Sequence, residues 1–147
     1  MNITEIMNKD LIKLELEADN KNDAIRELAD IIDKTGNLNN KEEYINAVME
    51  REKVFSTGIG MGIAIPHGKT NAVKKPTLAF GRSKKGIDYN SMDGTPAKLF
   101  FIIAVPEDSN DEHLRLLAQI SRKLMHEELR NNLLNASTAE EILKFLE

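Results

Sequence analysis

The chain has 147 residues, which suits a single domain with a hydrophobic core of its own. Hydrophobic residues make up 41% of the sequence and charged residues 30%, as in ordinary water-soluble globular proteins. The net charge of −4 and the absence of tryptophan argue against nucleic acid as the main partner, because phosphate binding needs a basic face and base stacking needs aromatic side chains.

The sequence contains no cysteine, which excludes disulfides, cysteine nucleophiles and thiolate metal sites. The first residues, MNITEIMNKD, lack the basic and apolar segments of a signal peptide. The longest apolar run, LFFIIAV at residues 99–105, is too short to cross a bilayer. These features predict a cytoplasmic protein without direct membrane insertion.

Strand and helix patterns alternate in the first part of the chain. Alternating leucines in LIKLELEA predict a strand around residues 14–16. Asn22 is a candidate cap for a helix that Gly36 ends, and Asn40 is a candidate cap for a second helix with Arg51 near its end. The side chains expected to face the core from these two helices are Ile25, Leu28, Ala29, Ile32, Tyr44, Ile45, Val48 and Met49.

Three apolar segments predict further strands at residues 62–66 (GIAIP), 77–81 (TLAFG) and 99–105 (LFFIIAV). The last of these is continuously apolar, as expected of a central strand that is covered on both faces. Glycine, asparagine and aspartate between residues 86 and 94 predict turns that send one strand back antiparallel to its neighbour.

Two helices are expected after the last strand. Asn110 is the predicted start of a long amphipathic helix, and Ser137 with Glu140 forms a capping-box pattern for a short final helix. Their expected core side chains are Leu114, Leu117, Ile120, Leu124, Ile142 and Phe145. This order of elements predicts a single-domain α/β sandwich over residues 1–147, with a mixed, mostly parallel central sheet flanked by helices.

Residues 62–70 read GIAIPHGKT and end in the manner of a nucleotide-binding P-loop. Five residues rather than four separate Gly62 from Gly68, and Pro66 has no N–H group to offer a phosphate. The preceding GIGMG run fails the dinucleotide pattern, because Ile63 occupies the place of the third glycine. We therefore interpret the segment as a strand that delivers His67 rather than as a nucleotide site.

His67 has two interpretations. The ordinary one is a turn histidine after a strand. Gly62 and Gly68 allow the backbone to approach a partner, and Pro66 stiffens the segment, which favours a held imidazole that acts as a nucleophile near neutral pH. One ring nitrogen must then donate its proton to a fixed acceptor, so that the other keeps a free lone pair.

His113 and Arg51 are the other candidates. His113 lies at a predicted helix N-terminus, which attracts anions and disfavours a protonated ring, so it is either a donor to a phosphoryl group or a solvent-facing residue. Arg51 either offsets the dipole at the end of its helix or supplies the positive, bidentate partner that a phosphoryl group in transfer needs.

The sequence gives weaker evidence for metal binding and for other anion-binding residues. Metal binding by His67 and His113 lacks an evident third ligand. Further candidates for contact with an anion are Ser56, Thr57 and Lys69, whereas Glu52, Lys53 and His126 are expected to face solvent.

Residues 51–68, REKVFSTGIGMGIAIPHG, resemble the active-site segment of the fructose/mannitol-type enzyme IIA of the bacterial phosphoenolpyruvate-dependent sugar phosphotransferase system. The resemblance continues through KKPTLAFGRSKKGIDY and NDEHLRLLAQISRKLM, covers nearly the whole chain, and is shared in its core by the nitrogen-regulatory branch. It implies a phosphotransferase in which His67 accepts a phosphoryl group from the phosphocarrier HPr and passes it to a cysteine of enzyme IIB. Arg51 and His113 match the residues that line the phosphoryl site.

The resemblance also implies enzyme IIB together with membrane enzyme IIC as partners, and no metal or organic cofactor. It favours a role in fructose-type sugar uptake, with a nitrogen-type regulatory role as the alternative, and it leaves the sugar open. Without a cysteine or a membrane span, the chain is expected to be a free IIA subunit or a piece of a fusion. Met61 stands where a polar residue such as Asn is common, which bears on partner fit rather than on chemistry.

Overall fold

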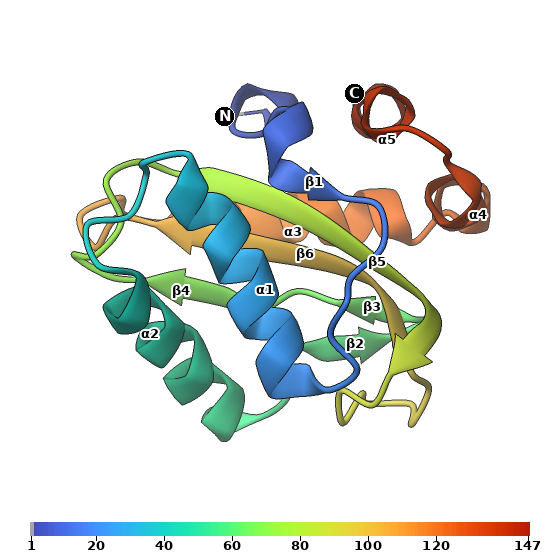
Figure 1. Cartoon of the computed structure of the whole chain (residues 1–147), viewed down its shortest axis with the longest axis horizontal. Coiled ribbons are helices and arrows are strands. Elements are labelled where there is room, and N and C mark those ends of the chain that lie inside the picture. Colours follow the sequence, from blue (N-terminus) through green and yellow to red (C-terminus); the bar gives the residue numbers. More distant parts are fainter. Residues whose placement is uncertain (1) are drawn as a thin grey trace.

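A mixed β-sheet separates two layers of helices in the computed structural model, which describes residues 2–147 except for the side chain of Glu112 (Figure 1). The helices are α1 (Lys21–Lys34), α2 (Lys41–Val54), α3 (Glu112–Leu124), α4 (Glu127–Asn135) and α5 (Ala139–Leu146). The strands are β1 (Ile12–Lys13), β2 (Gly58–Gly60), β3 (Ile63–Ala64), β4 (His67–Lys69), β5 (Thr77–Ile87) and β6 (Ala97–Val105), and short 3₁₀ turns η1 (Ile3–Glu5) and η2 (Lys9–Leu11) precede β1.

The strand order is β1-β5-β6-β3-β2, and β4 pairs with β6 off this path. The pairs β1/β5, β3/β6 and β4/β6 are parallel, whereas β5/β6 and β2/β3 are antiparallel. The turn-rich residues 88–96 join the antiparallel strands β5 and β6, as the sequence predicts. The predicted α/β class with a mixed sheet is therefore confirmed.

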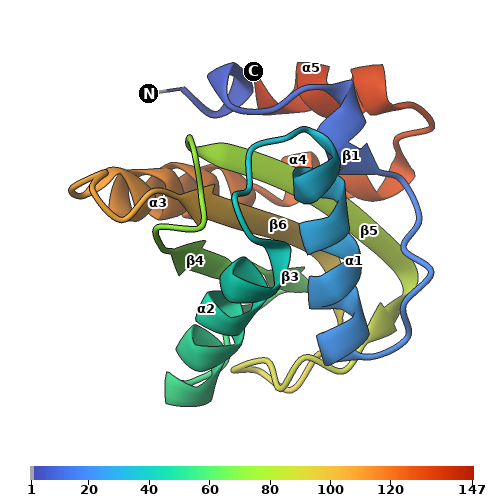
Figure 2. The same cartoon turned by 60° about the vertical axis from the view of Figure 1, so that its left-hand side comes forward.

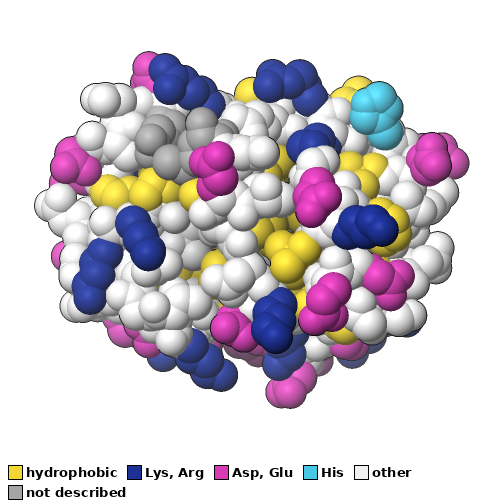
Figure 3. Space-filling view, turned by 90° about the horizontal axis from the view of Figure 1, so that it is seen from above, with side chains coloured by type: hydrophobic (Ala, Val, Ile, Leu, Met, Phe, Trp, Pro, Cys, Tyr) yellow, Lys and Arg dark blue, Asp and Glu magenta, His cyan; other side chains and the backbone are white. Residues whose placement is uncertain are grey.

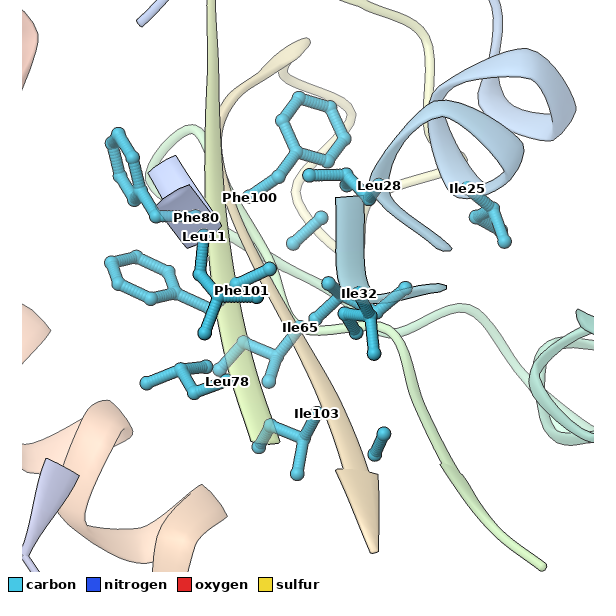
Figure 4. Packing of buried hydrophobic residues seen from close by; sticks show 14 of the residues in the cluster. Leu11, Ile25, Leu28, Ile32, Ile65, Leu78, Phe80, Phe100, Phe101 and Ile103 are labelled. Carbon is cyan, nitrogen blue, oxygen red and sulfur yellow. The ribbon is translucent and has the colours of Figure 1, made fainter. Parts of the chain in front are cut away.

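Strand β6 lies in the middle of the sheet and supplies core side chains to both faces. Figure 4 shows Phe100 near Leu28 of α1, whereas Phe101 lies on the other side of the strand beside Phe80 of β5. The rings of Phe80 and Phe101 meet edge to face with their centroids 5.2 Å apart. Because successive residues of a strand point to opposite faces, a continuously apolar strand needs a cover on each side.

That cover comes from different helices on the two faces. Helices α1 and α2 lie on one face of the sheet and α3 lies on the other, as Figures 1 and 2 both show. Helices α4 and α5 lie near the N-terminal segment. The face in Figure 3 carries basic and acidic side chains interspersed with small hydrophobic areas, which is the mixed charge of a solvated surface.

Two predictions for the N-terminal half were misplaced. Asn20 rather than Asn22 caps α1, and its side chain accepts a backbone N–H from the first helical turn at 2.9 Å. The predicted strand is shorter and lies earlier, at β1, because the chain leaves the ladder after two residues. Leu16 nevertheless donates its N–H to the carbonyl of Arg82 at 2.7 Å, so its side chain still enters the core.

The C-terminal half differs from the prediction at the helix ends. Asp111 rather than Asn110 precedes α3, because Asn110 adopts a left-handed backbone with φ of 57°. Leu114 is 54% exposed instead of facing the core. Thr138 rather than Ser137 caps α5 through its side chain, and α4 was not predicted at all.

Arg82 of β5 anchors α4 to the sheet from inside the protein. Its side chain is buried, and Nη1 donates to the carbonyl oxygens of Leu133 at 2.9 Å and Ala136 at 2.7 Å. Carbonyls at the end of a helix have no partner within the helix. The guanidinium therefore satisfies acceptors that would otherwise be buried without a donor.

Replacing Arg82 with methionine is expected to lower the free energy of unfolding by about 3 kcal/mol, because the buried carbonyls lose their charged donor. Urea unfolding followed by circular dichroism measures the change. Lys84→Met is the matched control, since Lys84 is an exposed cation on the same strand. A loss for Arg82→Met no greater than for the control would contradict this role.

Candidate active site

His67 opens strand β4 instead of following the end of an apolar strand as predicted. Strand β3 ends at Ala64, and Ile65 and Pro66 interrupt the ladder because proline has no N–H to donate. Both strands nevertheless keep one register along β6, where His67 lies opposite Ile103. The carbonyl of Pro66 accepts the N–H of Ile103 at 3.0 Å, which continues the pairing across the gap.

Gly68 allows α2 to lie close to β4. A Cβ at this position would stand 3.1 Å from both Tyr44 Cε1 and Val48 Cγ2 of α2, closer than ordinary packing permits. The hydroxyl of Tyr44 donates to the carbonyl of Ile103 at 2.8 Å and fixes the helix against the sheet. This contact brings the last turn of α2, which carries Arg51, to the side of His67.

The three predicted site residues line one pocket. Its volume is ≈ 370 Å³, and its lining residues are Ala47, Arg51, His67, Gly68, Lys69, His113, Leu114 and Leu117. The pocket is lined by residues of α2, β4 and α3, and the two helices cover opposite faces of the sheet (Figure 1). A second pocket of ≈ 220 Å³ shares Arg51, His67 and Leu117 with it. His67 therefore stands half-buried between two depressions of the surface.

The ring of His67 has a defined hydrogen-bond partner. Its Nδ1 lies 2.9 Å from the carbonyl oxygen of Ile65. Because a carbonyl oxygen only accepts, Nδ1 donates and Nε2 keeps the lone pair. Burial lowers the pKa of His67, and so do the nearby charges of Arg51 and His113, while the Ile65 carbonyl and the charge of Glu52 act in the opposite direction. The ring is therefore neutral near neutral pH.

NMR titration of the folded protein can measure the pKa of His67. The midpoint is expected below 6.5, the ordinary value, because burial disfavours the charged ring. Since the unfolded chain then binds the proton more readily, this group should reduce stability as the pH falls below 6.5 toward the folded pKa. Charged or titratable groups around the ring are Arg51, Lys69, His113 and Glu52. A folded-state midpoint at or above that of the urea-unfolded protein would contradict the burial argument.

His113 lies in the first turn of α3. Lys69 donates from Nζ to the carbonyl of Asn110 at 2.9 Å, which ties the start of this helix to β4. Burial and then the charge of Lys69 lower the pKa of His113, against the opposing effect of Asp111. Its Nδ1 is buried and has no hydrogen-bond partner among the described residues. The site thus holds a neutral imidazole with an unused polar atom.

Arg51 lies both at the end of α2 and beside His67. Nη1 donates to the carbonyl of Phe55 at 2.9 Å, which satisfies an acceptor just beyond the end of α2. The guanidinium also lies 4.6 Å from the centre of the Phe55 ring. It lines both pockets beside His67. A single side chain therefore stabilises the helix end and places a positive charge at the site.

The turn between β2 and β3 adopts a left-handed backbone over three residues, Gly60, Met61 and Gly62, with φ of 93°, 57° and 77°. The Asp93 carboxylate holds this turn by accepting the N–H of Met61 at 2.9 Å. That bond, with those from the hydroxyl and N–H of Thr95, lowers the pKa of Asp93 to about 2. The turn is therefore fixed by a group that stays ionised in ordinary buffers.

Replacing Met61 with asparagine is expected to raise the free energy of unfolding by about 0.5–1 kcal/mol, because asparagine tolerates the left-handed backbone better than methionine. The Met61 side chain is 42% exposed, so little apolar burial is lost. Met92→Asn is the control, since Met92 is exposed but is not among the residues with positive φ. Chemical unfolding measures both variants. An equal change in the free energy of unfolding would show that the left-handed backbone of Met61 is not the cause.

The structure corrects one expectation beside the site. Glu52 was predicted to face solvent, yet its side chain is only 5% exposed. Sequence periodicity could not reveal this, because two of its partners, Lys21 and Tyr89, come from distant segments. Of the weaker candidates, Lys69 lines the pocket of His67 and His113, whereas Ser56 and Thr57 line the neighbouring pocket.

The described residues offer no evident metal site. Nowhere among them do three or more histidine, aspartate or glutamate side chains lie together in a way that could hold a metal ion. Among the helices of residues 2–147, none combines the length and the apolar composition that a bilayer crossing requires.

Known proteins of the sugar phosphotransferase system match nearly the whole chain. The chain is 47% identical to the "PTS system fructose-specific EIIABC component" of Bacillus subtilis over 99% of its length, but it spans only 23% of that protein. It is 44% identical to the "PTS system fructose-specific EIIA component" of Haloferax volcanii, with 95% of this chain and 91% of the relative covered.

Solved structures of IIA proteins are also similar to this chain. The nitrogen regulatory protein IIA-Ntr from Neisseria meningitidis is 34% identical and superposes with a TM-score of 0.92, with 99% of both chains covered. In a complex of enzyme IIAMTL with phosphorylated enzyme IIBMTL from Escherichia coli, the matching chain is 26% identical with a TM-score of 0.83, and 95% of this chain and 96% of that chain are covered.

The family comparison covers both the pocket and the elements that build it. Residues 5–147 match the family described as "Phosphoenolpyruvate-dependent sugar phosphotransferase system, EIIA 2". The matched range includes α2, β4 and the start of α3, and with them Arg51, His67 and His113. The chain therefore belongs to the EIIA 2 family and is a phosphotransferase component of the sugar phosphotransferase system.

Proposed function

We propose that His67 accepts a phosphoryl group from phospho-HPr on Nε2 and passes it to the cysteine of an enzyme IIB. The observation that carries this proposal is the 2.9 Å hydrogen bond from Nδ1 to the Ile65 carbonyl, which leaves the lone pair on Nε2. The lowered pKa of His67 supports it, because only the neutral ring is a nucleophile.

The proposed transfer is a displacement at phosphorus. The lone pair of Nε2 forms the new N–P bond while the N–P bond of the donor histidine breaks, and the donor ring keeps the electron pair. The Arg51 guanidinium stabilises the negative charge of the phosphoryl oxygens, and the neutral His113 ring, which lines the same pocket, donates a hydrogen bond to one of those oxygens. Discharge to a thiolate sulfur of enzyme IIB reverses these roles.

Moderate stabilisation suits a carrier. The phosphoryl group must be stabilised during transfer but must remain reactive toward the next acceptor. The two cations that line the pocket, Arg51 and Lys69, each already donate to a backbone carbonyl, that of Phe55 and that of Asn110. The phosphoryl group on His67 therefore shares both cations with the backbone, in keeping with onward transfer.

Fructose-type sugar uptake is the role that the relatives support best, because both fructose-specific proteins exceed 40% identity. We propose that residues 1–147 act as one IIA unit, with enzyme IIB and membrane enzyme IIC as partners at the cytoplasmic face of the membrane. A nitrogen-type regulatory role is the second candidate, because the IIA-Ntr protein superposes over 99% of both chains.

A two-stage labelling experiment tests these roles. Labelled phosphoenolpyruvate, enzyme I and HPr are expected to label the protein at one acid-labile, base-stable position. A fructose-type enzyme IIB should then remove the label at a rate at least as fast as sugar uptake. Label that forms but is not discharged by IIB proteins would favour the regulatory role, and absence of any label with an active phospho-HPr would refute the carrier function.

A further inference from the structure

Glu52 is the centre of a buried polar cluster behind the active site. Its Oε1 accepts the N–H of Thr57 at 3.1 Å and pairs with Nζ of Lys21 at 3.0 Å. Its Oε2 accepts the hydroxyl of Tyr89 at 3.1 Å and also the hydroxyl of Thr57. We call Lys21, Glu52, Thr57 and Tyr89 the Glu52 cluster. It joins α1, the end of α2, the segment before β2 and the segment after β5.

Burying these polar and charged groups costs free energy of hydration unless they bind one another. A buried ion pair recovers its loss of hydration only with good geometry and further hydrogen bonds, so it is weak evidence for a role in stability alone. Lys21 is the first residue of α1, where a cation opposes the helix dipole. Burial, followed by the charge of Glu52, raises the pKa of Tyr89, so its hydroxyl remains a donor.

A chain of hydrogen bonds leads from this cluster to the active-site ring. Glu52 holds the N–H of Thr57, and the carbonyl of Thr57 accepts the N–H of Ile65 at 3.0 Å. The carbonyl of Ile65 is the group that binds Nδ1 of His67 at 2.9 Å. The position of that carbonyl therefore depends on Thr57, which the buried carboxylate fixes through both its N–H and its hydroxyl.

We propose that Glu52, with Lys21 as its counter-charge, is a positioning residue for His67: by fixing Thr57 and through it the Ile65 carbonyl, it selects the Nδ1–H tautomer and leaves Nε2 free for the phosphoryl group. This inference rests on the proposed carrier function. Glu52 lines neither pocket beside His67, so it acts through other residues and does not touch the phosphoryl group or the partner protein.

The decisive variant is Glu52→Gln. Glutamine keeps the shape of the side chain but offers one acceptor oxygen where donors approach both carboxylate oxygens, so part of the cluster must separate. Long-range ¹H–¹⁵N spectra of the unphosphorylated protein are expected to show a single Nδ1–H tautomer of His67 in the wild type and a mixture of tautomers in the variant. Glu50→Gln is the matched control, because Glu50 is an exposed acid on the same helix with its own lysine partner.

The same variants separate positioning from simple loss of structure. The His67 pKa should fall in Glu52→Gln, which removes a charge that raises it, and rise in Lys21→Met, which leaves that charge uncompensated. Loss of structure cannot produce shifts of opposite sign. Phosphoryl uptake by Glu52→Gln should slow by roughly ten- to a hundredfold in kcat, with little change in KM for phospho-HPr.

Each outcome decides the proposal. A pure Nδ1–H tautomer in Glu52→Gln, or a rate loss that only follows the folded fraction, would overturn it. If Glu52→Gln does not fold, Tyr89→Phe removes one donor from Oε2 and must show a smaller shift toward mixed tautomers, and no shift there overturns the proposal as well. The tautomer measurement needs no phosphoryl donor. Failure of the wild type to accept label would therefore count against the carrier function and leave this test intact.

Discussion

The variant His67→Ala is expected to lose phosphoryl uptake from phospho-HPr completely, while its fold remains. Removal of the ring removes Nε2, the only proposed acceptor atom. The ring is half-buried at the surface between two pockets, so its loss costs little core packing. Labelling from phosphoenolpyruvate through enzyme I and HPr gives the measurement.

The other two histidines of the chain provide the controls for this experiment. His126 is exposed at the start of α4 and lies outside both pockets beside His67, so His126→Ala should label as the wild type does. His113→Ala should label more slowly but to the same extent, because it retains the acceptor. Persistent labelling of His67→Ala would show that another residue receives the phosphoryl group.

Arg51→Ala is expected to slow phosphoryl uptake by roughly a hundred- to a thousandfold, the effect of removing a positive group that is aimed at charge in a transition state. The expected cost in stability is much smaller, about 1 kcal/mol, because the lost bond to the Phe55 carbonyl lies in a solvent-exposed helix end. Rapid-quench transfer from phospho-HPr and urea unfolding measure the two effects on the same protein.

Lys53→Ala is the matched control for Arg51→Ala. Lys53 is an exposed cation in the same helical turn, paired with Glu50. Both variants remove one positive charge from the last turn of α2, so a long-range effect on the encounter with HPr should appear in both. A rate for Arg51→Ala that stays near that of Lys53→Ala would mean that Arg51 serves only the helix end.

The parts of the fold that local chemistry dictates were predictable from the sequence. Asn40 caps α2 as predicted, with its side chain accepting a backbone N–H at 3.0 Å, and Gly36 follows α1 with a positive φ. The apolar run of residues 99–105 became the central strand β6. Helix α4 was not found, because its short polar sequence depends on the buried Arg82 for a cap that lies far away in the chain.

The site shows the same division between local and distant information. The spacing of glycines and proline around His67 was enough to single out that residue, and the helix positions of Arg51 and His113 were readable. Leu114 follows the apolar period of α3 but lines the pocket instead of the core. The burial of Glu52 could not be predicted from the sequence, because its counter-charge and one of its hydrogen-bond donors come from segments more than thirty residues away.

Arg51 and Glu52 are adjacent in sequence, yet Arg51 carries its charge to the pocket beside His67 and Glu52 carries its charge to the interior. Successive residues of an α-helix are rotated by about 100°, and the packing of Val48 on Gly68 sets the rotational phase of α2. Deleting Glu50 would therefore advance the sequence by one step, place a carboxylate where the guanidinium stood and bury Lys53 beside Lys21. The rotational phase of α2 thus decides whether a positive or a negative side chain faces the pocket. An insertion or deletion between Val48 and Arg51 would change that phase and therefore the sign of the charge.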